Sequence, residues 1–151
     1  MTQLKIKPIH YIIRVETDCV EVHRMGKINY TIDTKKGVIY TKITGNISFE
    51  LLRQHVSSVY SDPSFDINLN SISDLSKAKI EPSFTDISGF REFMLAYERQ
   101  RMNFKWAVIV SEKQDLRAFK LFKILSEGAL FTLKYFNSLE EAENWVTNKD
   151  P

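Results

Sequence analysis

The sequence predicts an α/β fold whose mixed sheet joins an N-terminal antiparallel hairpin to a parallel βαβ core, with helices packed on the sheet. Three observations predict this class. Two strand-like runs flank a turn at residues 34–37, amphipathic helical segments then alternate with apolar runs, and residues 105–110 form the nearly continuous apolar run typical of a central parallel strand. Such an alternation folds into one sheet with right-handed crossovers.

The composition is that of a globular protein. The chain has 151 residues, of which 43% are hydrophobic and 26% are charged. A domain of this length buries about 70% of the surface of its unfolded chain, so it folds without disulfides or metals. We interpret residues 1–151 as a single domain, with an N-terminal extension at 1–26 and the core at 27–148. Rough polar and apolar alternation at 11–15 and 19–23 is typical of a further hairpin.

Charge and residue usage exclude several classes of protein. Because 21 basic residues face 19 acidic ones, the chain lacks the strongly basic character of nucleic-acid-binding proteins. The single cysteine, Cys19, permits no intramolecular disulfide and no cysteine-rich zinc site, which is typical of a reducing compartment. The longest apolar run, 106–110, is far too short to cross a bilayer, and residues 1–10 do not read as a secretory signal. We therefore expect a cytoplasmic protein with no transmembrane segment and no nucleic-acid partner.

The predicted core begins with the hairpin and one helix. The strands at 28–33 and 38–44 are rich in Ile, Val, Tyr and Thr, and Gly37 supplies the positive φ that the turn requires. Ser48 is the predicted N-cap of the helix, which ends at Asp62-Pro63. Apolar residues recur along this helix at spacings of three and four, at Phe49, Leu52, Val56 and Val59.

The following elements alternate regularly. Ser138, with Glu141 three residues later, forms a capping box that opens the last helix, and Gly128 is the predicted αL cap of the helix before it. The side chains expected to pack inward from the last helix are Leu139, Ala142, Trp145 and Val146. The expected elements are a strand at 69–75, a helix at 83–101, a strand at 105–110, a helix at 114–127, a strand at 130–136 and a helix from 138.

Polar residues fall where the predicted parallel strands end. Asp74, Ser76 and Ser111 occupy such positions, and open α/β sheets commonly bind ligands at the carboxyl ends of their strands. We predict a crevice for a ligand or partner there. The alternative is that Asp74 and Ser76 only form hydrogen bonds with turn backbone.

The order of elements, with the segments GVIYTKITGNISFELL, WAVIVS and FNSLEEAENWV, resembles the SpoIIAA-like (STAS-like) domain family over residues 27–148. Domains similar to these include anti-sigma factor antagonists, which bind a partner kinase and are switched by phosphorylation of a serine in an Asp-Ser-Ser-Gly segment. The corresponding segment here is Asp86-Ile87-Ser88-Gly89, so the resemblance implies Ser88 as a candidate phosphoacceptor. Ile87 replaces the first serine, and the longer preceding loop moves Ser88 from the helix cap into the helix.

Two further surface features have both a functional and a purely structural interpretation. Ser83 is a second candidate phosphoacceptor, although capping of the helix explains its position more simply. A basic surface along one helix is either a solvated face or a contact for an acidic partner or lipid headgroups. Its residues are Lys113, Arg117, Lys120 and Lys123.

No motif in the sequence indicates catalysis. It contains no Walker or dinucleotide loop, no G-x-S-x-G elbow and no H-E-x-x-H, and its three histidines lack the spacing of a helical metal site. We expect neither enzyme activity nor a cofactor or metal. The remaining catalytic arrangement is Asp74 with His55, which requires the two side chains to converge in space.

We therefore expect a noncatalytic regulatory or scaffolding module that acts on an unidentified protein partner and is a candidate for phosphorylation switching. The alternative is a small-molecule or lipid-binding module, since the resembling families include domains linked to apolar ligand carriage. The ten phenylalanines, six tyrosines and two tryptophans would line an apolar pocket or simply fill a core. An exposed edge of the 28–44 hairpin would also permit a homodimer.

Overall fold

The computed structural model places the core of the chain. It describes residues 26–79, 84–98, 101, 103–114, 116–125, 127–128 and 131–148. The predicted extra hairpin at 11–15 and 19–23 lies outside the described residues, as do Cys19 and Ser83. None of the described helices combines the length and the apolar character that crossing a membrane requires.

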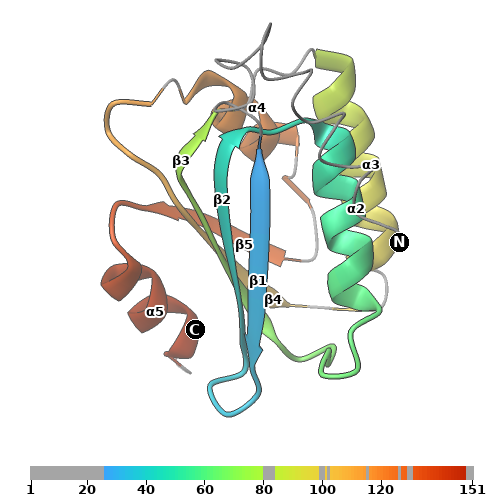
Figure 1. Cartoon of the computed structure of the whole chain (residues 1–151), viewed down its shortest axis with the longest axis vertical. Coiled ribbons are helices and arrows are strands. Elements are labelled where there is room, and N and C mark those ends of the chain that lie inside the picture. The colour runs from blue at the N-terminus through green and yellow to red at the C-terminus, as the bar shows by residue number, and fades with distance from the viewer. Residues whose placement is uncertain are drawn as a thin grey trace, which may run out of the picture.

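The strands form one five-stranded sheet in the order β1-β2-β3-β4-β5 (Figure 1). β1 pairs antiparallel with β2, and the other neighbouring strands are parallel. The predicted mixed sheet is thus confirmed. The strands are β1 (Lys27–Asp33), β2 (Val38–Asn46), β3 (Asn70–Lys79), β4 (Phe104–Ile109) and β5 (Phe131–Phe136).

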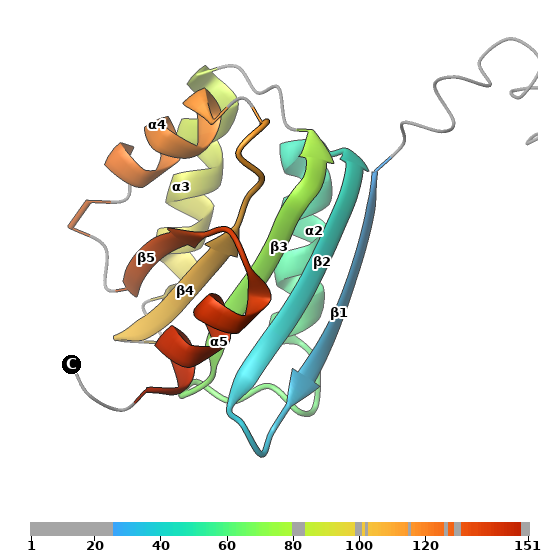
Figure 2. The ribbon, with the colours of Figure 1, turned by 90° about the vertical axis from the view of Figure 1, so that its left-hand side faces the viewer.

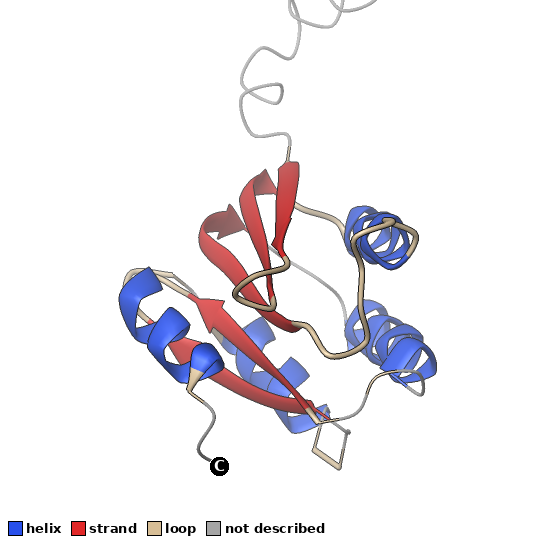
Figure 3. Cartoon of the chain, turned by 90° about the horizontal axis from the view of Figure 1, so that it is seen from below, coloured by secondary structure: helices blue, strands red, loops and turns tan. Residues whose placement is uncertain are grey.

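The helices cover both faces of this sheet. One face carries α2, α3 and α4, and the opposite face carries α5, which packs on β3 and β4 (Figures 2 and 3). This arrangement explains why β4 is apolar on both sides. The helices are α2 (Phe49–Tyr60), α3 (Phe84–Glu98), α4 (Arg117–Leu125) and α5 (Leu139–Thr147).

The local signals for turns and caps are confirmed. Gly37 has a φ of +70° in the hairpin turn; Gly128 has the expected positive φ, +89°, but α4 already ends at Leu125, two residues before the predicted end at 127. The Ser48 hydroxyl accepts a hydrogen bond from the Leu51 backbone N–H at 3.1 Å and so caps α2. Ser138 caps α5 in the same way, because its hydroxyl accepts from the Glu141 backbone N–H at 3.2 Å.

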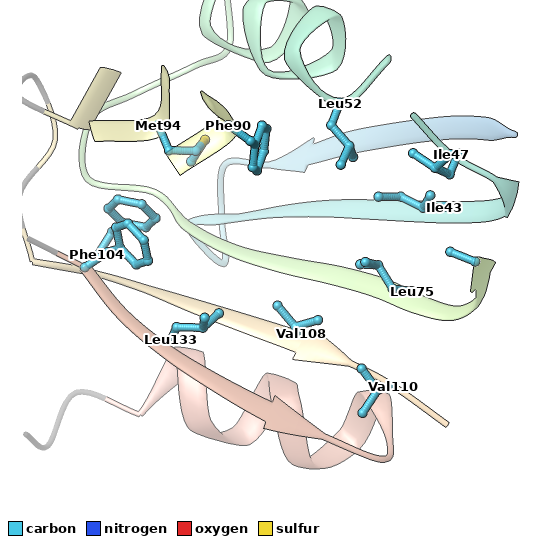
Figure 4. Close-up of a cluster of buried hydrophobic side chains, with 12 residues drawn as sticks. Ile43, Ile47, Leu52, Leu75, Phe90, Met94, Phe104, Val108, Val110 and Leu133 are labelled. Carbon is cyan, nitrogen blue, oxygen red and sulfur yellow. The ribbon is translucent and has the colours of Figure 1, made fainter. Parts of the chain in front are cut away.

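The two faces of the sheet have separate apolar cores. Figure 4 shows the larger one, in which side chains of the strands point toward Leu52, Phe90 and Met94 of the helices. Because side chains alternate along a strand, the intervening residues of the same strands form a second core under α5. Its buried members are Val38, Ile72, Ala107, Ile109, Ala142 and Val146.

Two boundaries differ from the prediction. β3 continues to Lys79 rather than ending at residue 75, because β2 shifts register between Lys42 and Thr44 and pairs with the added residues. Asp74 therefore lies within β3, although the pairing of β3 with β4 ends at Asp74 and Ile109. β4 has β3 and β5 as neighbours, so it lies one place away from the centre of the sheet.

Two details of the last helices also differ. α4 begins at Arg117 rather than at Gln114, because the Gln114 side chain bonds across to β3 from a loop. Leu139 is 50% exposed instead of packing inward, since it is the first residue of α5, beside its cap Ser138. The inward packing of Ala142 and Val146 is confirmed, as both are buried.

Candidate functional site

An open cleft of about 490 Å³ lies where β4 and β5 lead into the loops that follow them, beside the stretch of β3 that begins where its pairing with β4 ends at Asp74. We call it the strand-end crevice. It brings together the three residues predicted for such a site, Asp74, Ser76 and Ser111. Glu112, Lys113 and Asn137 also line it, so the crevice presents two carboxylates, hydroxyl groups, an ammonium and an amide. These groups are suited to polar recognition.

Asp74 and Ser76 form a local pair on β3. One carboxylate oxygen of Asp74 accepts hydrogen bonds from the Ser76 hydroxyl at 2.6 Å and from the Ser76 backbone N–H at 3.0 Å. These hydrogen bonds are the purely structural role that we expect for Asp74 and Ser76 as the alternative to a ligand site. The other carboxylate oxygen of Asp74 takes no part in these two hydrogen bonds.

Ser111 and Gln114 shape the opposite wall. The Ser111 hydroxyl accepts from the Lys113 backbone N–H at 3.2 Å, and the Ser111 backbone N–H donates to the Gln114 side chain. The Gln114 amide nitrogen donates to the carbonyl oxygens of Leu75 at 2.7 Å and Ala78 at 2.9 Å. Gln114 thus fastens the loop after β4 to β3, a role that the sequence did not indicate.

Ser88 lies away from the crevice lining, in α3. It is the fifth residue of α3 as described and is half-buried. The next residue, Gly89, leaves room for Arg53 of α2: a Cβ built at Gly89 would come within 3.2 Å of the Arg53 Nη2 atom. A cation therefore lies against the helix segment that contains Ser88.

The four predicted basic residues do not act as one group. All four are exposed. Lys113 lines the crevice, whereas the Lys123 Nζ atom donates to the Leu133 carbonyl oxygen of β5 at 3.0 Å. The structure thus separates Lys113, at the crevice, from Lys123, which is turned toward β5.

The candidate pair of Asp74 and His55 does not converge. Asp74 faces the α5 side of the sheet, while its neighbour Ser73 and His55 line a cavity on the α2 side. Burial lowers the pKa of His55 to about 4, so this imidazole is neutral at pH 7. Its Nε2 atom lies 3.3 Å from the Thr41 hydroxyl oxygen. Within the described part of the chain, no group of three or more His, Cys, Asp and Glu side chains is arranged to hold a metal ion.

A second hollow is mostly apolar; the sequence indicated that aromatic residues would line a pocket or fill a core, but not where. It lies between the sheet and the helices α2, α3 and α4 and has a volume of about 110 Å³. Arg101 lines it and is only 2% exposed. Arg101 falls just after the expected apolar face of α3, where a charged residue carries no sequence signal for burial.

The sheet order and the placement of the four helices define a SpoIIAA-like α/β domain. Solved structures that share this fold include the following two. One is an uncharacterized protein of the DUF3478 family with a SpoIIAA-like fold from Shewanella loihica PV-4, at 12% identity and a TM-score of 0.56, over 81% of this chain and 95% of that one. The other is an anti-sigma factor antagonist from Mycobacterium paratuberculosis, at 16% identity and a TM-score of 0.52, over 81% and 96% of the two chains.

The resemblance to SpoIIAA-like domains is confirmed by these two structures at the level of the fold. The sequence matches no protein-family model, and no curated protein matches it.

Proposed function

We propose that this protein is a noncatalytic regulatory module that binds a protein partner through the strand-end crevice and the adjoining start of α3. The observation that carries the proposal is the convergence of Asp74, Ser76 and Ser111 in one open cleft with the exposed Lys113 at its wall. Ligands and partners of open α/β sheets gather at this end of the strands.

The position of the crevice relative to α3 supports a continuous surface. β3 ends at Lys79 and α3 begins at Phe84, so the start of α3 lies at the same end of the sheet as the crevice. Gln114 holds the loop after β4 against β3 there. A surface held by such hydrogen bonds is preorganised, which lowers the entropic cost of binding a partner.

The fold neighbour from Mycobacterium paratuberculosis, an anti-sigma factor antagonist, is itself a regulatory protein, and this supports the same class of function here. Phosphorylation of Ser88 is the regulatory step that we propose. Arg53 lies against the neighbouring Gly89, so a phosphate on Ser88 would have a guanidinium within reach. Ser83 is the alternative phosphoacceptor. A cytoplasmic site of action belongs to the same proposal.

Charge reversal in the crevice tests the binding surface. The wild type, Lys113→Glu and Lys120→Glu would each be immobilised, and the proteins retained from a lysate of the native host would be quantified by mass spectrometry. Lys120 is the matched control because it is an exposed lysine on α4 that does not line the crevice. We expect a partner whose calorimetric affinity falls about tenfold with Lys113→Glu and changes by less than about twofold with Lys120→Glu. Equal retention by all three proteins would refute the proposed surface.

The serine switch needs its own experiment. Mass spectrometry of the protein isolated from its host should find phosphate on Ser88. We expect Ser88→Glu to weaken the partner complex because a new charge at the interface must be desolvated, whereas Ser88→Ala should leave the affinity unchanged. If Ser88→Glu binds like the wild type, the switch is wrong even where the crevice result stands.

The edge of the sheet at β1 leaves the homodimer as a further proposal. Among the strands that the structure describes, β1 lies at one end of the order and pairs only with β2. A second copy of the chain would add its own β1 to this edge. Sedimentation velocity would reveal a dimer, and Thr31→Pro, which breaks pairing in the middle of β1, should abolish it. A single monomer boundary at all concentrations would contradict this proposal.

A further inference from the structure

The cavity on the α2, α3 and α4 side of the sheet is large enough for a small organic molecule. Its volume is about 110 Å³, somewhat less than the roughly 150 Å³ of an engineered apolar cavity that holds benzene, and it is partly open, so it has room for a short hydrocarbon chain. Most of the wall is apolar, with Val56, Met94, Trp106 and Phe122 among its side chains. It lies on the other face of the sheet from Asp74, so it does not depend on the crevice.

Arg101 is the exception in this wall. Its side chain is buried, and its Nη1 atom donates to the Tyr60 hydroxyl oxygen at 3.1 Å. Its Nη2 atom donates to the Leu69 carbonyl oxygen. The Nε–H group has no hydrogen-bond partner. A buried donor without an acceptor is unfavourable, and such groups in native structures call for an explanation.

The charge of Arg101 also lacks a partner. Among the described residues, the ion pairs join Lys36 to Glu143 and Arg53 to Glu50, and neither includes Arg101. The ring of Phe104, with its centroid 3.6 Å from the guanidinium carbon, offsets part of the cost of burial. A buried cation is normally paired with an anion, because desolvation of an isolated charge costs several kilocalories.

Other polar groups of the wall have partners within the wall. The Thr41 hydroxyl and His55 lie within hydrogen-bonding distance of each other, at 3.3 Å. The Trp106 indole N–H donates to the Ser73 hydroxyl at 3.0 Å. The Arg101 Nε–H is therefore the group of this wall that is buried without a hydrogen-bond partner.

We propose that this cavity binds a small carboxylate with an apolar body, of about the size of hexanoate. The carboxylate accepts the hydrogen bond from Arg101 Nε and supplies the missing negative charge, and the hydrocarbon chain lies among Val56, Met94 and Phe122. The protein then binds an organic acid on one face of the sheet and its macromolecular partner at the crevice. This inference stands independently of the proposed function.

Binding can be observed from within the cavity. The chain has two tryptophans, Trp106 and Trp145, and only Trp106 lines the cavity. A Trp145→Phe protein would report hexanoate through Trp106 fluorescence, and calorimetry on the unmodified protein would give the stoichiometry. We expect one hexanoate per chain, and binding that tightens about fourfold for each methylene from butanoate to hexanoate. Hexanol and hexylamine, of equal length, should bind about tenfold or more weakly than hexanoate.

Two variants localise the site. Arg101→Met should weaken hexanoate binding about tenfold or more, whereas Lys120→Met, which removes an exposed cation outside the cavity, should change it by less than about twofold. Val56→Phe fills the cavity and keeps Arg101, so it should abolish binding even if Arg101→Met fails to fold. Lys113→Glu should leave hexanoate binding unchanged, which separates this site from the crevice.

The titration of the unmodified protein is decisive by itself. Absence of saturable hexanoate binding would overturn the inference, as would hexanol or hexylamine binding as tightly as hexanoate. Equal losses in Lys120→Met and Arg101→Met would overturn the assignment to the cavity and indicate general attraction of anions.

Discussion

The guanidinium carbon of Arg101 lies 3.6 Å from the centroid of the Phe104 ring, so the charge stacks on an aromatic face instead of meeting a carboxylate. Arg101 is buried, and its guanidinium carbon also lies 5.6 Å from the ring centroid of Tyr60 and 5.5 Å from that of Phe65. Such a cluster stabilises a cation only in part. We therefore expect the buried charge to lower the stability of the protein in the absence of an anion.

Replacement of this arginine should not destabilise the unliganded protein. We expect Arg101→Met to leave the free energy of unfolding unchanged or to raise it by about 1 kcal/mol, because an apolar side chain of similar length removes an unpaired buried charge. Urea denaturation at pH 7 measures this difference. A loss of more than about 2 kcal/mol would show that the hydrogen bonds to Tyr60 and Leu69 outweigh the desolvation of the charge.

The burial of His55 predicts acid sensitivity. The pKa of His55 is about 4 in the folded protein and 6.5 in the unfolded chain, so the unfolded chain takes up the proton first as the pH falls. The stabilising contribution of neutral His55 is complete above pH 6.5 and is lost progressively as the pH falls from 6.5 to about 4. We expect a loss of about 2 kcal/mol between pH 7 and pH 5.

The control for this prediction is His55→Gln, which cannot take up a proton. Its free energy of unfolding should depend less on pH over the same interval, whatever stability it loses at pH 7. Parallel pH profiles for the variant and the wild type, measured by urea denaturation, would show that other groups cause the acid sensitivity.

A hydrogen bond from the Tyr40 hydroxyl to the Glu143 carboxylate ties β2 to α5. This bond lowers the pKa of Glu143, and burial together with the same bond raises the pKa of Tyr40. The Glu143 contribution is complete above its ordinary pKa of 4.5 and is lost as the pH falls through the lowered value. The Tyr40 contribution is complete below its ordinary pKa of 10.0 and is lost as the pH rises through the raised value.

The effect of Tyr40→Phe on the free energy of unfolding should therefore be largest between pH 4.5 and 10.0. At pH 7 we expect its free energy of unfolding to be about 1–2 kcal/mol lower than that of the wild type, and the difference should shrink at pH 3. Lys36→Met is the control, because the exposed Lys36–Glu143 ion pair at 3.4 Å contributes less than about 1 kcal/mol. A Tyr40→Phe effect that is equal at pH 3 and pH 7 would contradict the prediction.

The fold was predictable because its signals are local. Signals such as the Gly37 turn and the Ser48 and Ser138 caps depend on only a few neighbouring residues. The spacing of apolar residues distinguishes strands from helices. The extension of β3 to Lys79 was not, because the shifted register of β2 that pairs with it lies more than 30 residues earlier in the chain.

The candidate site was predictable only in part. Asp74, Ser76 and Ser111 converge as the strand-end rule implies, since the carboxyl ends of parallel strands share one edge of a sheet. Arg101 and Gln114 carried no comparable signal. Arg101 bonds to Leu69, 32 residues away, and Gln114 bonds to Leu75, 39 residues away. Such contacts become visible only when the elements are assembled.

The side-chain amide of Gln114 donates to two backbone carbonyl oxygens, so replacing it by a carboxylate should weaken the loop that it holds. Its side-chain nitrogen donates to Leu75 and Ala78, and its side-chain oxygen accepts from the Ser111 backbone N–H. Gln114→Glu would set a carboxylate oxygen against the two carbonyl oxygens. We expect it to lower the free energy of unfolding by about 2–3 kcal/mol and to speed amide hydrogen exchange at Ser111.

Replacement of an exposed glutamine by glutamate should change the free energy of unfolding little. Gln54 lies on the surface of α2, so Gln54→Glu should change the free energy of unfolding by less than about 0.5 kcal/mol, mainly through repulsion from Glu50 one turn earlier. If both variants lose equal stability, Gln114 does not hold the loop. If Gln114→Glu opens the loop, it should also weaken partner binding at the crevice while hexanoate binding in the separate cavity persists, because Gln114 does not line that cavity.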